Sequence, residues 1–104
     1  MTEIQNPKQY DLEERTFLFA ENVRLFVKQI PKTIGGIEDG RQVIRSSGSV
    51  GANYIEANEA KESLFWLRLI DTGNYADLEK QRAALVQEAM ELRKIFGAIV
   101  TKSV

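Results

Sequence analysis

Three glutamates with a spacing of three residues are the first group in this sequence whose side chains could do chemistry together. Glu56, Glu59 and Glu62 would lie near one face if residues 56–62 are helical. Carboxylate metal sites in helical bundles also need histidine, and the chain contains none. We therefore predict solvated or ion-paired glutamates, no metal and no cofactor. A carboxylate-based enzyme that uses Glu56 and Glu62 is the weakest of three functional hypotheses.

Four basic side chains form a second group, which could bind phosphates. Arg41 and Arg45 are one helical turn apart, and Lys61 and Arg68 would extend the same patch. Such a patch predicts RNA or DNA binding that weakens steeply with salt and is lost when Arg41 and Arg45 are reversed in charge. However, 14 basic and 15 acidic side chains give a net charge of −1, without the strongly basic footprint of most nucleic-acid-binding domains. Nucleic-acid binding is therefore the alternative hypothesis.

Small and aromatic residues form a third group. Gly48 and Gly51 interrupt an expected helix, where a glycine costs up to about 1 kcal/mol relative to alanine. We predict that a neighbouring backbone approaches closely there. The rival interpretation is a phosphate-binding loop, although the run matches neither glycine-rich phosphate motif. Trp66, Phe65 and Tyr54 could stack on bases, but their helical spacing among leucines favours packing in a core or a subunit interface.

No side chain qualifies as catalytic. The chain lacks cysteine as well as histidine, which excludes disulfide scaffolds, zinc knuckles, thiol nucleophiles and most hydrolase triads. Ser49 and Asn53 are four residues apart with no base nearby, so we expect them to make hydrogen bonds between helices. No apolar run approaches the ~20 residues of a membrane-spanning helix, and the polar first residues match no signal or transit peptide. We expect a cytoplasmic protein without membrane contact.

Helices must position these groups, because no segment alternates with period two. Residues 1–11 form a polar arm, and Asp11 is the expected cap of a first helix that runs to Ile30 and is stopped by Pro31. The expected core row of this helix is Phe17, Ala20, Val23, Val27 and Ile30, widened by Leu12, Phe19 and Phe26 and by Leu18 and Leu25.

The glycine-rich residues 31–41 are expected to be a connection, with Ile34 and Ile37 sealing the end of the core. A second helix then begins near Asp39, its expected cap. Its expected core row steps by four and three through Val43, Ser47, Val50, Tyr54 and Ala57.

The last helix follows a turn at residues 72–74, with Asn74 or Asp77 as its cap. Its expected core row is Leu78, Leu85, Ala89, Leu92, Phe96 and Ile99. We expect its charged residues Glu88, Glu91, Arg93 and Lys94 to lie mostly on the solvated side.

The chain between Ala52 and Asp71 has no glycine, no proline and no clear turn. One interpretation is a single helix over residues 41–72, about 48 Å long at 1.5 Å per residue. The other is a turn near Asn58–Ser63 followed by a short third helix over Glu62–Asp71. The apolar face formed by Leu64, Leu67 and Ile70 indicates helix in both interpretations.

The run Ile44–Ala57 resembles the signature of a bacterial family, the four-helix-bundle proteins first met as open reading frames in intervening sequences of 23S ribosomal RNA genes (S23 ribosomal protein-like). Similar patterns of this family appear in Asp11–Thr16 and in Trp66–Ile70, and the resemblance covers nearly the whole chain. The family's recurrent positions fall on Arg45, Ser46, Gly48, Ser49, Gly51, Asn53, Glu56, Glu62 and Trp66.

This resemblance implies an all-α, antiparallel, up-down-up-down, left-handed four-helix bundle, a single domain over residues 1–104 that commonly assembles as a homopentamer. It implies no enzymatic activity and mainly structural signature residues, with Arg45 paired to a glutamate. A related branch, the accessory proteins of diversity-generating retroelements, binds nucleic acid and a reverse transcriptase through a basic surface, from which this slightly acidic chain departs. The leading hypothesis is a non-enzymatic, self-assembling bundle that recognises an RNA or protein partner.

Family members carry an additional stretch, with the turn between the second and third helices, between the equivalents of Ala60 and Lys61. Here Glu59-Ala60 is followed directly by Lys61-Glu62, so we expect a missing or shortened turn near residues 60–61. The cause is a true deletion or, in preference, a mobile segment absent from the printed sequence. An intact mass near 11.8 kDa would refute the second explanation.

Overall fold

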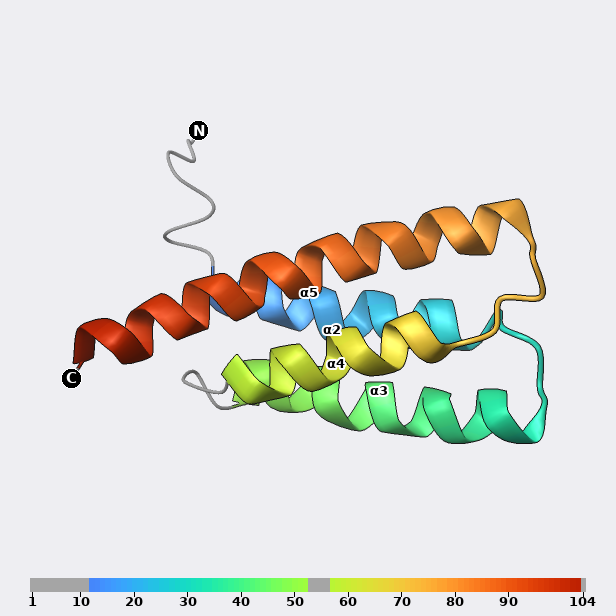
Figure 1. Cartoon of the computed structure of the whole chain (residues 1–104), viewed down its shortest axis with the longest axis horizontal. Helices are drawn as coiled ribbons and strands as arrows, with labels where there is room; N and C mark the ends of the chain where they lie inside the picture. Colours follow the sequence, from blue (N-terminus) through green and yellow to red (C-terminus); the bar gives the residue numbers. More distant parts are fainter. Residues whose placement is uncertain (1–11, 53–56, 104) are drawn as a thin grey trace.

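The computed structural model describes residues 12–52 and 57–103, and its elements there are all α-helices (Figure 1). They are α2 (Leu12–Val27), α3 (Ile34–Ala52), α4 (Ala57–Leu69) and α5 (Ala76–Ser103). The described residues contain no strand, which confirms the all-α prediction. Within these ranges, no helix has both the length and the apolar character needed to cross a membrane.

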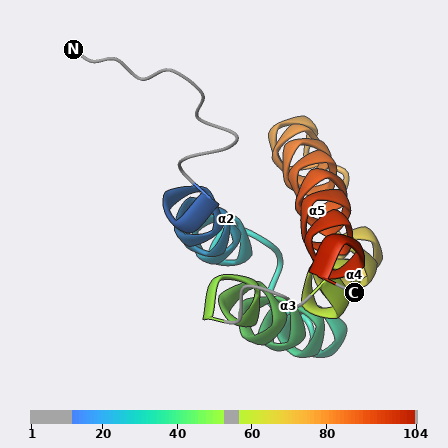
Figure 2. The same ribbon diagram turned by 90° about the vertical axis from the view of Figure 1, so that its left-hand side faces the viewer.

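Each helix packs against two of the others. α2 contacts α3 and α5, and α4 contacts the same two helices, whereas the described residues give no contact between α2 and α4 or between α3 and α5. Viewed end on, the helices are arranged around a shared centre (Figure 2). The connection from α2 to α3 and the connection from α4 to α5 lie at the same end of the molecule (Figure 1).

Apolar side chains from all four helices fill this centre. The buried set comprises Phe19, Val23, Phe26, Ile30, Val43, Val50, Ala60, Leu67, Ile70, Leu78, Leu85, Ala89, Leu92 and Phe96. The core row predicted for the last helix is therefore confirmed as far as Phe96. Ile99 is 36% exposed, and the end of α5 extends past the other helices (Figure 1).

The core face predicted for the first helix is confirmed in part. Val23 and Ile30 are buried, as are Phe19 and Phe26 of the wider face. Phe17 is 60% exposed, and Leu18 and Leu25 are exposed as well, so these three predictions are wrong. The buried positions, which include Thr16, alternate steps of three and four residues and so follow the helical period. α2 also ends at Val27, and Ile30 reaches the core from a turn in which its N–H donates to the Val27 carbonyl oxygen (3.3 Å).

The connection predicted over residues 31–41 is wrong over most of its length, because α3 begins at Ile34. Thr33 caps the helix, since the Gly36 N–H donates to the Thr33 Oγ1 atom (3.0 Å). The glycine-rich stretch is thus helical. Ile34 is 90% exposed and Ile37 is 53% exposed, so neither seals the core as expected.

Residues 57–69 form one continuous helix, which contradicts both interpretations of this part of the chain. A single helix over residues 41–72 is wrong because α3 and α4 pack against each other, with Ser46 hydrogen-bonded to Ser63. A turn at Asn58–Ser63 is wrong because those residues are helical, and α4 also runs without interruption through the junction at residues 60–61.

The turn between α4 and α5 uses left-handed backbone conformations. The Gly73 N–H donates to Asp71 Oδ1 (2.8 Å), and Gly73 and Asn74 have φ angles of 70° and 63°. Asn74 is therefore not the expected cap, because an N-cap residue has an extended conformation. Asp77 is not the cap either, because it lies inside the first turn of α5, which begins at Ala76.

Arg82 of α5 links the end of α4 to the first turns of α5. Its Nη1 atom donates to the carbonyl oxygens of Ile70 and of Arg68 (3.3 Å), which are left without partners where α4 ends. Its Nη2 atom donates to both carboxylate oxygens of Glu79 (2.9 and 2.8 Å), and the Thr72 hydroxyl donates to the same carboxylate. The Thr72 hydrogen bond, followed by those from Arg82, lowers the pKa of Glu79 below its usual value.

Candidate interaction site

The contact between α3 and α4 contains two buried hydroxyl groups. The Ser46 and Ser63 Oγ atoms are 2.9 Å apart, and both side chains are fully buried. Ser63 also lies 2.9 Å from the Glu59 carbonyl oxygen of its own helix. Beside them Ala60 is completely buried. These small side chains let the two helices approach closely and fix their register by a hydrogen bond.

A charged network continues this contact to the surface. Arg45 Nη2 donates to Glu62 Oε2, and Arg45 Nη1 lies 3.7 Å from Glu59 Oε1. The Trp66 indole N–H donates to the same Glu62 oxygen (3.2 Å). The Arg45 side chain is 51% exposed, so this pairing orients the side chains more than it stabilises the fold.

We call this set the α3–α4 seam, formed by Arg45, Ser46, Glu59, Glu62, Ser63 and Trp66. It brings together four of the predicted signature positions and supplies the expected glutamate partners of Arg45. Two further signature positions, Asn53 and Glu56, lie outside the described residues, as do the aromatic Tyr54 and the expected cap Asp11.

Exposed apolar side chains border the α3–α4 seam. Phe65 is 55% exposed and Leu69, one turn further along α4, is 52% exposed. The Phe65 ring meets the half-buried Trp66 ring edge to face, with centroids 5.0 Å apart and planes at 82°. Rigid aromatic side chains next to an ordered arginine are typical of protein–protein interfaces.

The close-approach interpretation of the glycines holds at Gly51 but not at Gly48. A Cβ atom on Gly51 would lie 3.0 Å from Thr16 Oγ1 and 3.3 Å from Thr16 Cβ, so α2 is tightly packed there. A Cβ atom on Gly48 would meet only Arg24 Nη2 at 3.7 Å, an ordinary contact. Ser49, expected to bridge helices, instead donates to the Arg45 carbonyl oxygen of its own helix (3.1 Å).

The four predicted phosphate-binding residues do not form one patch. Arg45 is occupied by two glutamates, and Arg41 lies 3.8 Å from Glu38 with both side chains exposed. Lys61 and Arg68 are exposed on α4. At about 100° per residue they project from the side of the helix opposite the residues that contact α3. The structure thus separates the predicted patch into two parts.

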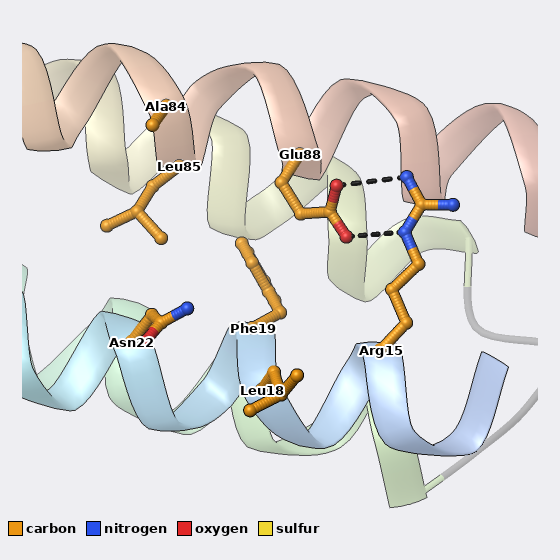
Figure 3. Close-up of a pocket in the computed structure, with 7 residues that line it drawn as sticks. All are labelled: Arg15, Leu18, Phe19, Asn22, Ala84, Leu85 and Glu88. Carbon is orange, nitrogen blue, oxygen red and sulfur yellow. Dashed lines mark hydrogen bonds and ion pairs between the residues drawn. The ribbon is translucent and has the colours of Figure 1, made fainter. Parts of the chain in front are cut away.

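A cleft between α2 and α5 was not anticipated from the sequence (Figure 3). Its volume is about 320 Å³, and its lining residues are Arg15, Leu18, Phe19, Asn22, Ala84, Leu85 and Glu88. The Phe19 side chain projects from α2 toward α5, with the paired Arg15 and Glu88 side chains to one side of it (Figure 3). The lining of the cleft is mainly apolar, and its charged side chains, Arg15 and Glu88, lie together at one side.

Arg15 joins α2 to α5 through two carboxylates. Its Nε and Nη2 atoms donate to Glu88 (2.6 and 2.9 Å), and Nη2 also donates to Glu91 (2.6 Å). The hydrogen bond to Glu88 is the main cause of the raised pKa of Arg15. Of the four charged residues expected mostly on the solvated side, Arg93 and Lys94 are exposed. Glu88 and Glu91 instead pair with Arg15 of α2, with side chains 28% and 39% exposed. The sequence carries a signal for these ion pairs, because Arg15 lies near the start of the first expected helix and Glu88 and Glu91 lie on the last.

The described residues contain no group of three carboxylates placed to hold a metal ion. Glu59 and Glu62 instead face Arg45, which matches the predicted ion-paired state of these glutamates.

In comparisons with protein-family models, curated proteins and solved structures, nothing matches the chain. The class that the structure itself defines is an all-helical protein of four described helices with a polar α3–α4 seam. The resemblance to the 23S ribosomal RNA intervening-sequence proteins therefore stands as a proposal based on the residues of the sequence.

Proposed function

We propose that this chain is a non-enzymatic bundle that assembles with copies of itself, as a homopentamer, and recognises a partner through the assembled surface. It resembles the 23S ribosomal RNA intervening-sequence proteins, and its helices follow their antiparallel, up-down-up-down, left-handed arrangement. The helix contacts α2–α3, α3–α4, α4–α5 and α5–α2 support such an arrangement.

The observation that carries this proposal is the number of large apolar side chains left on the surface. Phe17, Leu18 and Leu25 on α2 and Phe65 and Leu69 on α4 are each between 42% and 60% exposed. Exposed apolar groups of this size on neighbouring turns are typical of protein–protein contacts. Their burial between subunits explains why these positions are apolar although the core does not need them.

Sedimentation of the full chain over a range of micromolar concentrations tests this proposal. We expect a species of five chains that dissociates on dilution. Only monomers at tens of micromolar would overturn self-assembly, and a stable assembly of another size would overturn the pentamer alone.

The alternative function is nucleic-acid binding, which the exposed Lys61 and Arg68 side chains favour. They lie seven residues apart on one side of α4, and no ion pair to either is recorded among the described residues. Two adjacent phosphates could be bound there, with an affinity that falls as salt rises. Titration of labelled RNA and DNA at low salt tests this function, with Lys61→Glu/Arg68→Glu as the variant and Lys80→Glu/Lys94→Glu as the control of equal net charge. Equal binding by both variants, or no binding by the parent chain, would argue against it.

A further inference from the structure

A groove lies on the outside of the contact between α2 and α3, and we call it the α2–α3 groove. Its volume is about 220 Å³, and its wall is aliphatic, with Val27, Ile37 and Ile44 among the lining residues. None of the described residues that line it is aromatic. Pockets that enclose a whole small molecule have volumes of roughly 300–1,000 Å³. The α2–α3 groove is smaller, and its Ile37 is 53% exposed, so it is suited to one apolar side chain of a larger partner.

Cations surround the α2–α3 groove. Lys32 and Arg41 line it directly. Arg24 reaches α3 one turn beyond the wall of the groove, where its Nη2 atom would lie 3.7 Å from a Cβ atom on Gly48. Lys28 is exposed one helical turn after Arg24, since its N–H donates to the Arg24 carbonyl oxygen (3.1 Å). Four cations therefore lie on this side of α2 and α3.

The carboxylates on this side do not balance these cations. Glu38 Oε1 lies 3.8 Å from Arg41 Nε, and both side chains are more than half exposed, so this pair compensates the charge weakly. Glu21 is exposed one turn before Arg24 on α2. In the described part of the chain no ion pair to the other three cations is recorded. Four cations thus face two carboxylates, and this side is positive although the whole chain has a net charge of −1.

An acidic protein segment with an apolar side chain fits the α2–α3 groove better than a nucleic acid does. Arginine and lysine bind carboxylates through charge-assisted hydrogen bonds. An apolar pocket inside a polar rim is the usual seat of the side chain that anchors a protein partner. A nucleic acid would offer phosphates to the cations, but its bases bind by stacking on aromatic side chains, and the described lining of the groove has none. The aliphatic wall therefore favours a protein partner.

We infer that the α2–α3 groove binds an acidic segment of a partner protein. A leucine-sized side chain of this segment lies between Ile37 and Ile44, and its carboxylates lie beside Lys32 and Arg41. This inference rests on the proposed recognition of a partner and does not require assembly, because the groove lies within one subunit.

Binding of a labelled peptide tests this inference. The probe is a short fluorescent peptide in which glutamates flank a pair of leucines, and its binding to the full chain is followed by fluorescence anisotropy. We expect saturable binding with a dissociation constant below about 1 mM, which weakens as the salt concentration rises. Replacing the leucines by serines, or the glutamates by glutamines, should in each case weaken binding by about tenfold or more.

A pair of isoleucine variants locates the apolar contact on the chain. Ile37→Ser removes a side chain that lines the groove and should weaken peptide binding by about tenfold or more. Ile34→Ser is the matched control, because Ile34 belongs to the same turn of α3, is 90% exposed and does not line the groove. This control should bind the peptide as the parent chain does. Circular dichroism of each variant establishes that the helices are intact.

A pair of charge variants locates the carboxylate contacts. Lys32→Glu/Arg41→Glu should weaken peptide binding by about tenfold or more. Lys80→Glu/Lys94→Glu makes the same change in net charge at exposed positions of α5 and should leave peptide binding unchanged.

The possible results separate this inference from the proposed function. If the chain assembles but shows no saturable binding of the peptide, or loses binding equally in the groove variants and their controls, this inference is overturned and self-assembly stands. Binding of polyuridylate that is lost in Lys32→Glu/Arg41→Glu, without binding of the peptide, would assign the groove to nucleic acid and overturn this inference as well. A chain that sediments only as a monomer and still binds the peptide would overturn the proposed assembly alone.

Discussion

Gly40 lies in the middle of α3 where that helix packs against α2, and its replacement should show how tightly the two helices fit. A Cβ atom at Gly40 would lie 2.9 Å from Val27 Cγ1, a separation that requires the neighbour to move. Val27 is β-branched and belongs to the last turn of α2, so its methyl groups have little rotational freedom to yield. Gly48, eight positions further along the same helix, offers a matched control. A Cβ atom there would have Arg24 Nη2 as its nearest neighbour, at an ordinary contact distance of 3.7 Å.

The two substitutions share one contribution and differ in another. Glycine to alanine within a helix stabilises the folded state by about 1 kcal/mol through backbone entropy, at both positions. At Gly40 the added methyl group also overpacks the contact with Val27, which costs about 1–3 kcal/mol. Gly48→Ala should therefore stabilise the protein by up to about 1 kcal/mol. Gly40→Ala should be lower in unfolding free energy than Gly48→Ala by about 1–3 kcal/mol.

Urea denaturation of the parent and both variants at one fixed protein concentration measures this difference, since assembly contributes to apparent stability. A double-mutant cycle with Val27→Ala then isolates the contact. Once the Val27 methyl groups are removed, Gly40→Ala should become stabilising, with a coupling of about 1–3 kcal/mol. Equal stabilisation by Gly40→Ala and Gly48→Ala in the parent background would refute the packing described for α2 and α3.

Three further substitutions test other contacts. Arg15→Gln should lower the free energy of unfolding by about 1.5–3 kcal/mol in chemical denaturation, because it removes charged hydrogen bonds to the partly buried Glu88; an unchanged midpoint would contradict the geometry of the α2–α5 cleft. The lowered pKa of Glu79 means that its carboxylate stabilises the fold above the usual value of 4.5, and that this contribution is lost as the pH falls through the lowered pKa. Glu79→Gln should therefore lose less stability on acidification than the parent, and parallel pH profiles would count against the Thr72 hydrogen bond. Ile34→Thr should change thermal stability by less than about 0.5 kcal/mol, because this side chain is 90% exposed; a large loss would show that it seals the core after all.

The features predicted correctly from the sequence were those fixed by a long and uniform repeat. On α5 the seven-residue spacing of Leu78, Leu85 and Leu92 continues over many turns, and all three side chains are buried. The pairing of Arg45 with a glutamate, implied by the family resemblance, also agrees with the structure.

The errors concern helix ends, where single hydrogen bonds decide the outcome. The start of α3 depends on the Thr33 side chain capping a turn that contains two glycines, and composition favoured a loop there. Between Ala52 and Asp71 the sequence has no glycine or proline, yet a separate helix, α4, begins at Ala57. In α4 the residues Glu59, Glu62 and Ser63 face α3, so Lys61 projects away from Arg45.

The helix α2 shows why the interaction surface was the hardest feature to locate. Its sequence contains apolar residues at helical spacing on two sides, and periodicity gives both sides equal weight. Only the packing shows that Phe19 and Val23 face the core, while Phe17 and Leu18 remain exposed. An apolar residue that the core does not bury needs another explanation, and the proposed self-assembly would bury these residues between subunits. The residues that made the core prediction fail are thus the ones on which that proposal rests.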